Sequence, residues 1–104
     1  MDEQDVDLRA KLNSETARIA WPELERHFAR GVVVWVAPGL DLIEVAHAMA
    51  RDDSAALTAW LQAGQVARAE TEQARDWHAR QAEFWAVVVA PWVVIQESQP
   101  RLDS

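Results

Sequence analysis

Hydrophobic residues along this chain gather in two valine-rich runs, which are separated by segments with helical spacing. The runs, Val32–Ala37 and Ala86–Ile95, are apolar at consecutive positions rather than at alternate ones. Successive side chains of a strand point to opposite faces of a sheet, so such a run indicates a strand covered on both faces. Both runs therefore predict strands, and the segments between them predict helices that cover the sheet.

Two helices are expected ahead of the first strand. Leu8 and Leu12 recur at helical spacing behind Asp5 and Asp7, two acids that suit an N-cap and a first turn. We therefore expect the first helix over Val6–Arg18.

Proline and glycine mark the ends of the second helix. Trp21 precedes Pro22 and is pushed toward an extended conformation, whereas Pro22 suits the first turn of a helix. Gly31 is a favourable residue just past a helix C-terminus. These signals predict a helix over Pro22–Arg30, with Phe28 on its inner face.

Two further helices are expected after the first strand. Pro38-Gly39 signals a turn, and the next segment, Asp41–Arg51, combines one apolar stripe with one polar face. That polar face consists of Asp41, Glu44, His47 and Arg51. Asp52–Ser54 interrupts the pattern and supplies a new cap, so a separate helix is expected over Ser54–Ala63, ended by Gly64.

The last part of the chain predicts a helix between a short strand and a long one. Val66–Ala69 fits a short strand, and Thr71 is expected to cap the helix that follows. The helix is expected to carry Ala74, Trp77, Phe84 and Trp85. Ala86–Ile95 is expected to be a single long strand, in which Pro91 marks a bulge or an edge position because it cannot donate to a sheet hydrogen bond. A two-residue hairpin at Ala90-Pro91 is not expected, since primed turns need positive φ.

These elements predict an α/β (α+β) domain with a small mixed sheet. We expect two or three strands packed with four or five helices, in the order α-α-β-α-α-(β)-α-β. An alternative is a winged-helix-like variant whose wing is replaced by a helix. Ser54–Ala63 would then occupy the recognition-helix position, but it contains no Arg, Lys or Asn to reach base edges or phosphates.

The expected domain organisation is one globular unit between two tails. With 104 residues and no long linker, the chain has room for a single domain. We place an acidic disordered tail at residues 1–5, the α/β domain at residues 6–96 and a flexible C-terminal tail at residues 97–104.

Composition excludes several functions. Seventeen acids against ten bases give a net charge of -7, which argues against generic binding to DNA or to an anionic membrane. We expect Arg68, Arg75 and Arg80 to form a solvated face. No cysteine is present, which excludes a thiol nucleophile and thiolate zinc sites, and with three glycines no phosphate-cradling loop can form. No cofactor is predicted.

No targeting or spanning segment is expected either. The acidic N-terminus lacks the basic and apolar regions of a signal peptide. The longest apolar stretch, Phe84–Ile95, contains Pro91 and is too short to cross a bilayer. The expected location is the cytoplasm.

Candidates for chemistry are few. Glu44 and His47 stand three residues apart, as do the carboxylate–histidine pairs of di-iron bundles, but those sites need a second copy of the motif and further carboxylates. A solvated helix face explains this pair more simply. His27 and His78 share no ligand spacing with it and fit the border of a core.

Tryptophan is the more informative residue. The chain has six tryptophans. Trp35, Trp60 and Trp77 fall at core-type positions, and the other three flank prolines or strand ends: Trp21, Trp85 and Trp92. Exposed aromatic side chains near a proline-marked strand are typical of binding surfaces. Trp85, Pro91, Trp92 and Trp21 are therefore the candidate interaction surface, although all six indoles could equally belong to the core.

Five segments of the chain form a distinctive set: Leu8–Asn13, Phe28–Gly31, Asp41–Ala46, Trp60–Gly64 and Trp85–Val93. Together they resemble a small bacterial family known as domain of unknown function 2288. The resemblance covers roughly residues 8–96, and its most specific part is the tryptophan, valine run, proline, tryptophan string. The resemblance implies a single-domain bacterial protein and supplies no catalytic residue.

Two functions of different classes follow from these observations. The first is a non-enzymatic protein-interaction or regulatory module, which could form a homodimer through the strand that contains Pro91 or through the Trp85–Trp92 surface. The alternative is a small enzyme or metal- or ligand-binding protein that uses Glu44, His47 and nearby acids.

Overall fold

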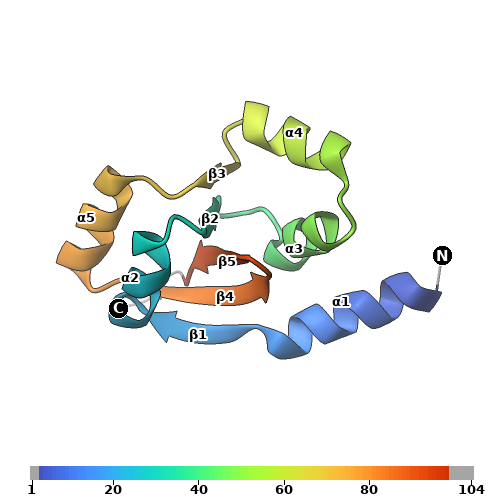
Figure 1. Ribbon diagram of the computed structural model, residues 1–104, viewed down its shortest axis with the longest axis horizontal. Coiled ribbons are helices and arrows are strands. Elements are labelled where there is room, and N and C mark those ends of the chain that lie inside the picture. Colours follow the sequence, from blue (N-terminus) through green and yellow to red (C-terminus); the bar gives the residue numbers. More distant parts are fainter. Residues whose placement is uncertain (1–2, 99–104) are drawn as a thin grey trace.

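A computed structural model describes residues 3–98, in which helices and strands are interspersed along the chain (Figure 1). In chain order the elements are α1 (Glu3–Glu15), β1 (Ala17–Ala20), α2 (Trp21–Ala29), β2 (Val33–Val36), α3 (Leu42–Ala50), α4 (Ser54–Gln62), β3 (Val66–Arg68), α5 (Thr71–Arg80), β4 (Glu83–Val89) and β5 (Trp92–Glu97).

The strands form one mixed sheet. Its five strands within residues 3–98 lie in the order β1-β4-β5-β2-β3. The β2–β5 pair is parallel, with Val33 opposite Val93, and the other three pairs are antiparallel. The hairpin of β4 and β5 thus occupies the centre of the sheet, while β1 and β3 form its edges.

Each face of the sheet has its own hydrophobic core. On one face, which we call the α2–α5 face, Phe84 and Ile95 pack with Trp21, Leu24 and Trp77 from the two helices. On the opposite α1–α3 face, the core comprises Leu12, Val34, Val36, Leu42, Val45, Ala46, Val66, Val87 and Val94. The predicted α+β class is therefore confirmed, and the valine runs are covered on both sides as their sequence indicates.

Figure 1 shows α2 and α5 together at one end of the molecule, with α1, α3 and α4 at the other. Helix α4 differs from the rest because none of its residues is buried. Asp41 caps α3 by accepting from Ile43 N at 2.9 Å, and Asp53 caps α4 by accepting from Ala56 N at 3.2 Å.

The first helix ends before the predicted Arg18 and begins before the predicted Val6. Thr16 Oγ1 donates to the Leu12 carbonyl at 2.8 Å and Thr16 N to the Asn13 carbonyl, and these bonds close the last turn. Residues 17–20 then leave the helix and pair with β4 as β1, a strand that the sequence pattern did not predict.

The predicted helix that runs on to Phe84 and Trp85 is also wrong, because α5 ends at Arg80. Gln81 adopts a left-handed conformation with φ 52° and terminates the helix, so that Phe84 and Trp85 belong to β4. The cap is Glu70 rather than Thr71. In a capping box, Glu70 N donates to the side-chain oxygen Oε1 of Gln73 at 2.9 Å.

The predicted single strand over residues 86–95 is two strands joined by the hairpin that was not expected. Val89 pairs with Trp92, so that Ala90 and Pro91 alone form the turn. The Ala90–Pro91 peptide bond is cis, and a turn with cis-proline at its third position reverses the chain without positive φ. The prediction considered only the primed turns.

These differences change the strand count from two or three to five and add strands to the predicted order. The winged-helix alternative does not fit, because β2 lies inside a five-stranded sheet, between β5 and β3. The predicted tail at residues 97–104 begins one residue early, because Glu97 still belongs to β5. The rest of that segment, residues 99–104, lies outside the described residues.

Candidate functional site

An open groove lies on the α1–α3 face, where the helices leave part of the sheet uncovered. Its largest hollow, of about 790 Å³, is lined by Pro38, Gly39, Leu40, Asp41, Trp85, Gln96 and Glu97. Two smaller hollows adjoin it and share Asp41 as a lining residue; they add Arg9, Ala10, Asn13, Thr16, Leu42 and Ile43. We call this continuous surface the Trp85 groove.

Trp85 forms the aromatic part of the groove. The sheet register places it between Arg18 of β1 and Gln96 of β5. Its side chain is 42% exposed, and the guanidinium carbon of Arg18 lies 5.4 Å from the centre of the indole. Glu83 holds Arg18 through a 2.6 Å bond to Nη2. The indole thus already carries one stacked guanidinium, which shows that its π-face suits a cation.

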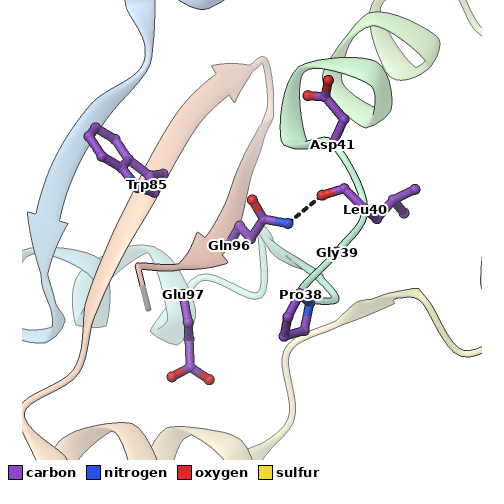
Figure 2. A pocket seen from close by; sticks show the side chains of 7 residues that line it. All are labelled: Pro38, Gly39, Leu40, Asp41, Trp85, Gln96 and Glu97. Carbon is purple, nitrogen blue, oxygen red and sulfur yellow. Dashed lines mark hydrogen bonds between the residues drawn. The ribbon is translucent and has the colours of Figure 1, made fainter. Parts of the chain in front are cut away.

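Gln96 ties the sheet to the loop that borders the groove. Its Nε2 donates to the Leu40 carbonyl and, at 2.9 Å, to the Ala37 carbonyl. Figure 2 shows the Gln96 amide between Trp85 and Asp41, with its oxygen pointing away from Leu40. Since both donors of the amide serve the loop, the oxygen remains as an acceptor on the groove side.

Acidic charge in the groove comes from Asp41 rather than from Glu97. In Figure 2 the Glu97 carboxylate points away from Gln96 and Asp41. It accepts from Trp77 Nε1 at 3.1 Å and from Arg80 Nη2 at 2.9 Å on the opposite side of the sheet. Asp41 stands at the start of α3 and makes no ion pair with a described residue.

An ion pair between α1 and α3 closes the far end of the groove. Arg9 binds the Glu44 carboxylate in a bidentate manner, through Nη1 and Nη2. The hydrogen bond from Arg9 lowers the pKa of Glu44, despite an opposing effect of burial, and His47 adds a smaller lowering charge. Glu44 is thus held ionised and already has a cationic partner.

Glu44 and His47 do not form a reactive pair. The predicted solvated helix face is wrong for His47, which is only 6% exposed, because α3 packs against α1, α4 and the sheet and leaves little of its surface in solvent. Within residues 3–98, no group of three or more His, Asp or Glu side chains could hold a metal ion. His27 is half-buried and His78 is exposed, each on another helix.

The four residues of the predicted interaction surface do not come together. Trp21 is 3% exposed and belongs to the core of the α2–α5 face. Trp92 lies at the turn end of the hairpin beside exposed Pro91, and Trp85 lies about four residues, or roughly 13 Å, further along it. Arg68 stacks on Trp92 at 5.4 Å from the ring centre. Trp85 alone therefore lines the groove.

Sequence reasoning missed the other walls of the groove. Asn13 and Thr16 looked like helix residues, and the Pro38–Asp41 segment looked like a simple turn. Their joint position depends on α1 lying beside α3 and on Gln96 bonding to the loop. No short sequence pattern predicts either of these two contacts. The sequence did indicate a helix that starts at Asp41.

Comparisons with known proteins confirm the family resemblance. A family model described as "Protein of unknown function (DUF2288)" matches residues 7–97. A solved structure, "NMR solution structure of PA1075 from Pseudomonas Aeruginosa", is 49% identical with a TM-score of 0.80, and the match covers 96% of this chain and 93% of that chain. Among curated proteins, no match was found. None of the helices within residues 3–98 has the length and apolar character to cross a membrane. The chain belongs to the DUF2288 family of proteins of unknown function.

Proposed function

We propose that this protein is a non-enzymatic interaction module that binds an arginine-containing segment of a partner protein in the Trp85 groove. The observation that carries the proposal is the 42% exposed indole of Trp85 in an open groove. Large exposed aromatic side chains beside a hollow are typical of protein-binding surfaces.

The polar groups of the groove favour a donor-rich, cationic side chain. The Asp41 carboxylate and the Gln96 amide oxygen are acceptors, and the indole face attracts a guanidinium. The net charge of -7 would also attract a basic segment over a longer range. Arg9, the guanidinium at the far end, is engaged by Glu44 and does not cancel the Asp41 charge.

The test is a titration followed by the indole N–H signals in nitrogen-15 NMR. The probe is a blocked pentapeptide, Gly-Arg-Gly-Arg-Gly, compared with the same peptide carrying citrulline, which has the shape of arginine without its charge. We expect the arginine peptide to shift the Trp85 signal and the citrulline peptide to do so much less. Equal shifts with both peptides, or none at millimolar concentration, would contradict the proposal.

Variants separate the contributions within the groove. Trp85→Ala should weaken binding by about two- to fivefold, the range of an exposed cation–π contact. Asp41→Asn should also weaken it while keeping the helix cap, because asparagine caps as well as aspartate. Val88→Ala is the matched control, since Val88 is 59% exposed on the other face of the same strand.

Self-association through the same surface is the competing outcome. Sedimentation at micromolar concentration would then give a dimer, and Trp85→Ala would give a monomer. We expect a monomer for both proteins, which would leave the groove free for a partner of another kind.

A further inference from the structure

A slot between α2 and α5, on the face opposite the Trp85 groove, has a different character. Its volume is about 360 Å³. One side of each helix lines the slot. The lining residues are Trp21, Glu25, Phe28 and Ala29 on α2, and Thr71, Ala74, Arg75 and His78 on α5. Spacings of three, four and seven residues put each set on one side of its helix.

The base and one wall of the slot are aromatic. The rings of Trp21 and Phe28 lie 5.9 Å apart at 56°, and Trp21 also contacts Trp77 at 6.0 Å. Ala74 is 7% exposed and leaves room between the helices because its side chain is small. The slot therefore offers an apolar surface that would suit a ring or a short aliphatic chain.

Two residues that line the slot, Trp21 and Arg75, carry hydrogen-bond donors without an acceptor among the described residues. Trp21 is 97% buried, at 3% exposure, and its Nε1 meets no acceptor among residues 3–98. An indole N–H can only donate, and a buried donor without an acceptor is rare in native structures. Arg75 lines the same slot and forms no ion pair or hydrogen bond with the described residues.

Of these two donors the Arg75 guanidinium is the exposed one, and an acceptor with a negative charge would suit it. Arg75 supplies a full positive charge. Glu25 is the single acid on the slot, at the α2 side. We propose that the slot binds a small carboxylic acid with an apolar ring, whose carboxylate contacts Arg75 and whose ring packs against Trp21 and Phe28.

Three compounds of one shape but different charge test the proposal: 3-phenylpropionate, 3-phenylpropanol and phenethylamine. Binding is followed by the Trp21 indole N–H signal, assigned with a Trp21→Phe variant. The carboxylate should shift this signal at the lowest concentration, the alcohol at a higher one and the amine at the highest. Equal responses to all three, or no response to the carboxylate, would overturn the proposal.

Removing the positive or the negative charge that lines the slot should change carboxylate affinity in opposite directions. Arg75→Gln should weaken carboxylate binding by about tenfold, the effect of losing one charge-assisted hydrogen bond. Glu25→Gln should strengthen it, because a repelling charge is removed. Arg26→Gln, on α2 but outside the slot, is the control and should change nothing. If Arg75→Gln and Arg26→Gln behave alike, the carboxylate is not recognised at this slot and the proposal fails.

Discussion

Phe84 and Trp85 are neighbours in sequence but lie on opposite faces of β4, and their burial differs accordingly. Phe84 is 0% exposed and meets Trp77 edge-on with ring centres 5.1 Å apart. Trp85 is 42% exposed and contacts Arg18. The first side chain therefore stabilises the fold, whereas the second is open to solvent.

Truncating each of these two side chains should separate stability from binding. Phe84→Ala should lower the free energy of unfolding by about 3–5 kcal/mol, because it leaves a cavity in the core. Trp85→Ala should lower it by less than about 1 kcal/mol while it abolishes the groove's aromatic surface. Urea denaturation followed by far-ultraviolet circular dichroism measures both. Similar losses for the two variants would contradict the assignment of Trp85 to an open surface.

The Arg9–Glu44 pair predicts a pH dependence of stability. The pKa of Glu44 in the folded protein is below its ordinary value of 4.5, so its contribution is present above that value and is lost as the pH falls through the folded pKa. The side chains of the pair are 40% and 44% exposed, which limits the contribution to roughly 0.2–1 kcal/mol.

Glu44→Gln should therefore be less stable than the native chain at pH 7 by that small amount. The difference should shrink as the pH falls below 4.5 and vanish below the lower pKa that Glu44 has in the folded protein, since a protonated glutamate resembles glutamine. Urea titrations at several pH values check this. A difference that stays constant down to acid pH would show that the ion pair is not its cause.

At the scale of single residues, the sequence predicted some burial correctly. Trp77 fell at a core position and is 1% exposed, whereas Trp21, which was a candidate for a partly exposed position, is 3% exposed. The proline that follows Trp21 restricts its backbone but carries no information about its surroundings. Burial of Trp21 depends on α5 packing against α2, a contact between segments far apart in the chain.

At the scale of elements, segments with a clear apolar pattern or clear end signals were predictable, and β1, which has neither, was not. Helices α3 and α4 and strand β2 lie within one or two residues of their predicted positions. Strand β1, with the sequence Ala-Arg-Ile-Ala, is too short to show an alternating pattern. It becomes a strand because β4 offers it a hydrogen-bonding edge.

The caps of α3 and α4 should differ in what they stabilise. Removing an aspartate N-cap costs about 0.5–2 kcal/mol of helix stability. Because α3 buries five residues and α4 buries none, Asp41→Ala should lower the melting temperature of the whole domain. Asp53→Ala should instead increase amide hydrogen exchange within α4 and leave the melting temperature nearly unchanged. A large fall in melting temperature for Asp53→Ala would mean that α4 is coupled to the core.

At the scale of the whole molecule, the fold class was predictable but the strand order was not. The valine runs indicate strands covered on both faces, and this requires helices on both sides. Which strand lies next to which depends on contacts between distant segments of the chain. Strand β2 pairs in parallel with β5, some sixty residues further on, and Val33 lies opposite Val93. The groove and the slot both depend on such distant pairings, which explains why only single lining residues could be identified from the sequence.

Hydrogen exchange should follow the order of the strands. Amides in β4 and β5 at the centre are expected to exchange only through global unfolding, since each central strand is paired on both sides. Amides in the edge strands β1 and β3 should exchange faster, by local opening. Native-state exchange measured by NMR over a denaturant series checks this order, and equal protection in β1 and β4 would contradict it.

The central position of the β4–β5 hairpin also has a consequence for how the protein is made. Within the described residues, β1 pairs with β4 alone, and β2 pairs with β3 and β5. A ribosome releases β1, β2 and β3 before either strand of the hairpin. Until the hairpin has emerged, β1 therefore lacks its strand partner and β2 can pair only with β3. Folding during synthesis is thus delayed, and the apolar strands made first stay exposed to chaperones and to other nascent chains.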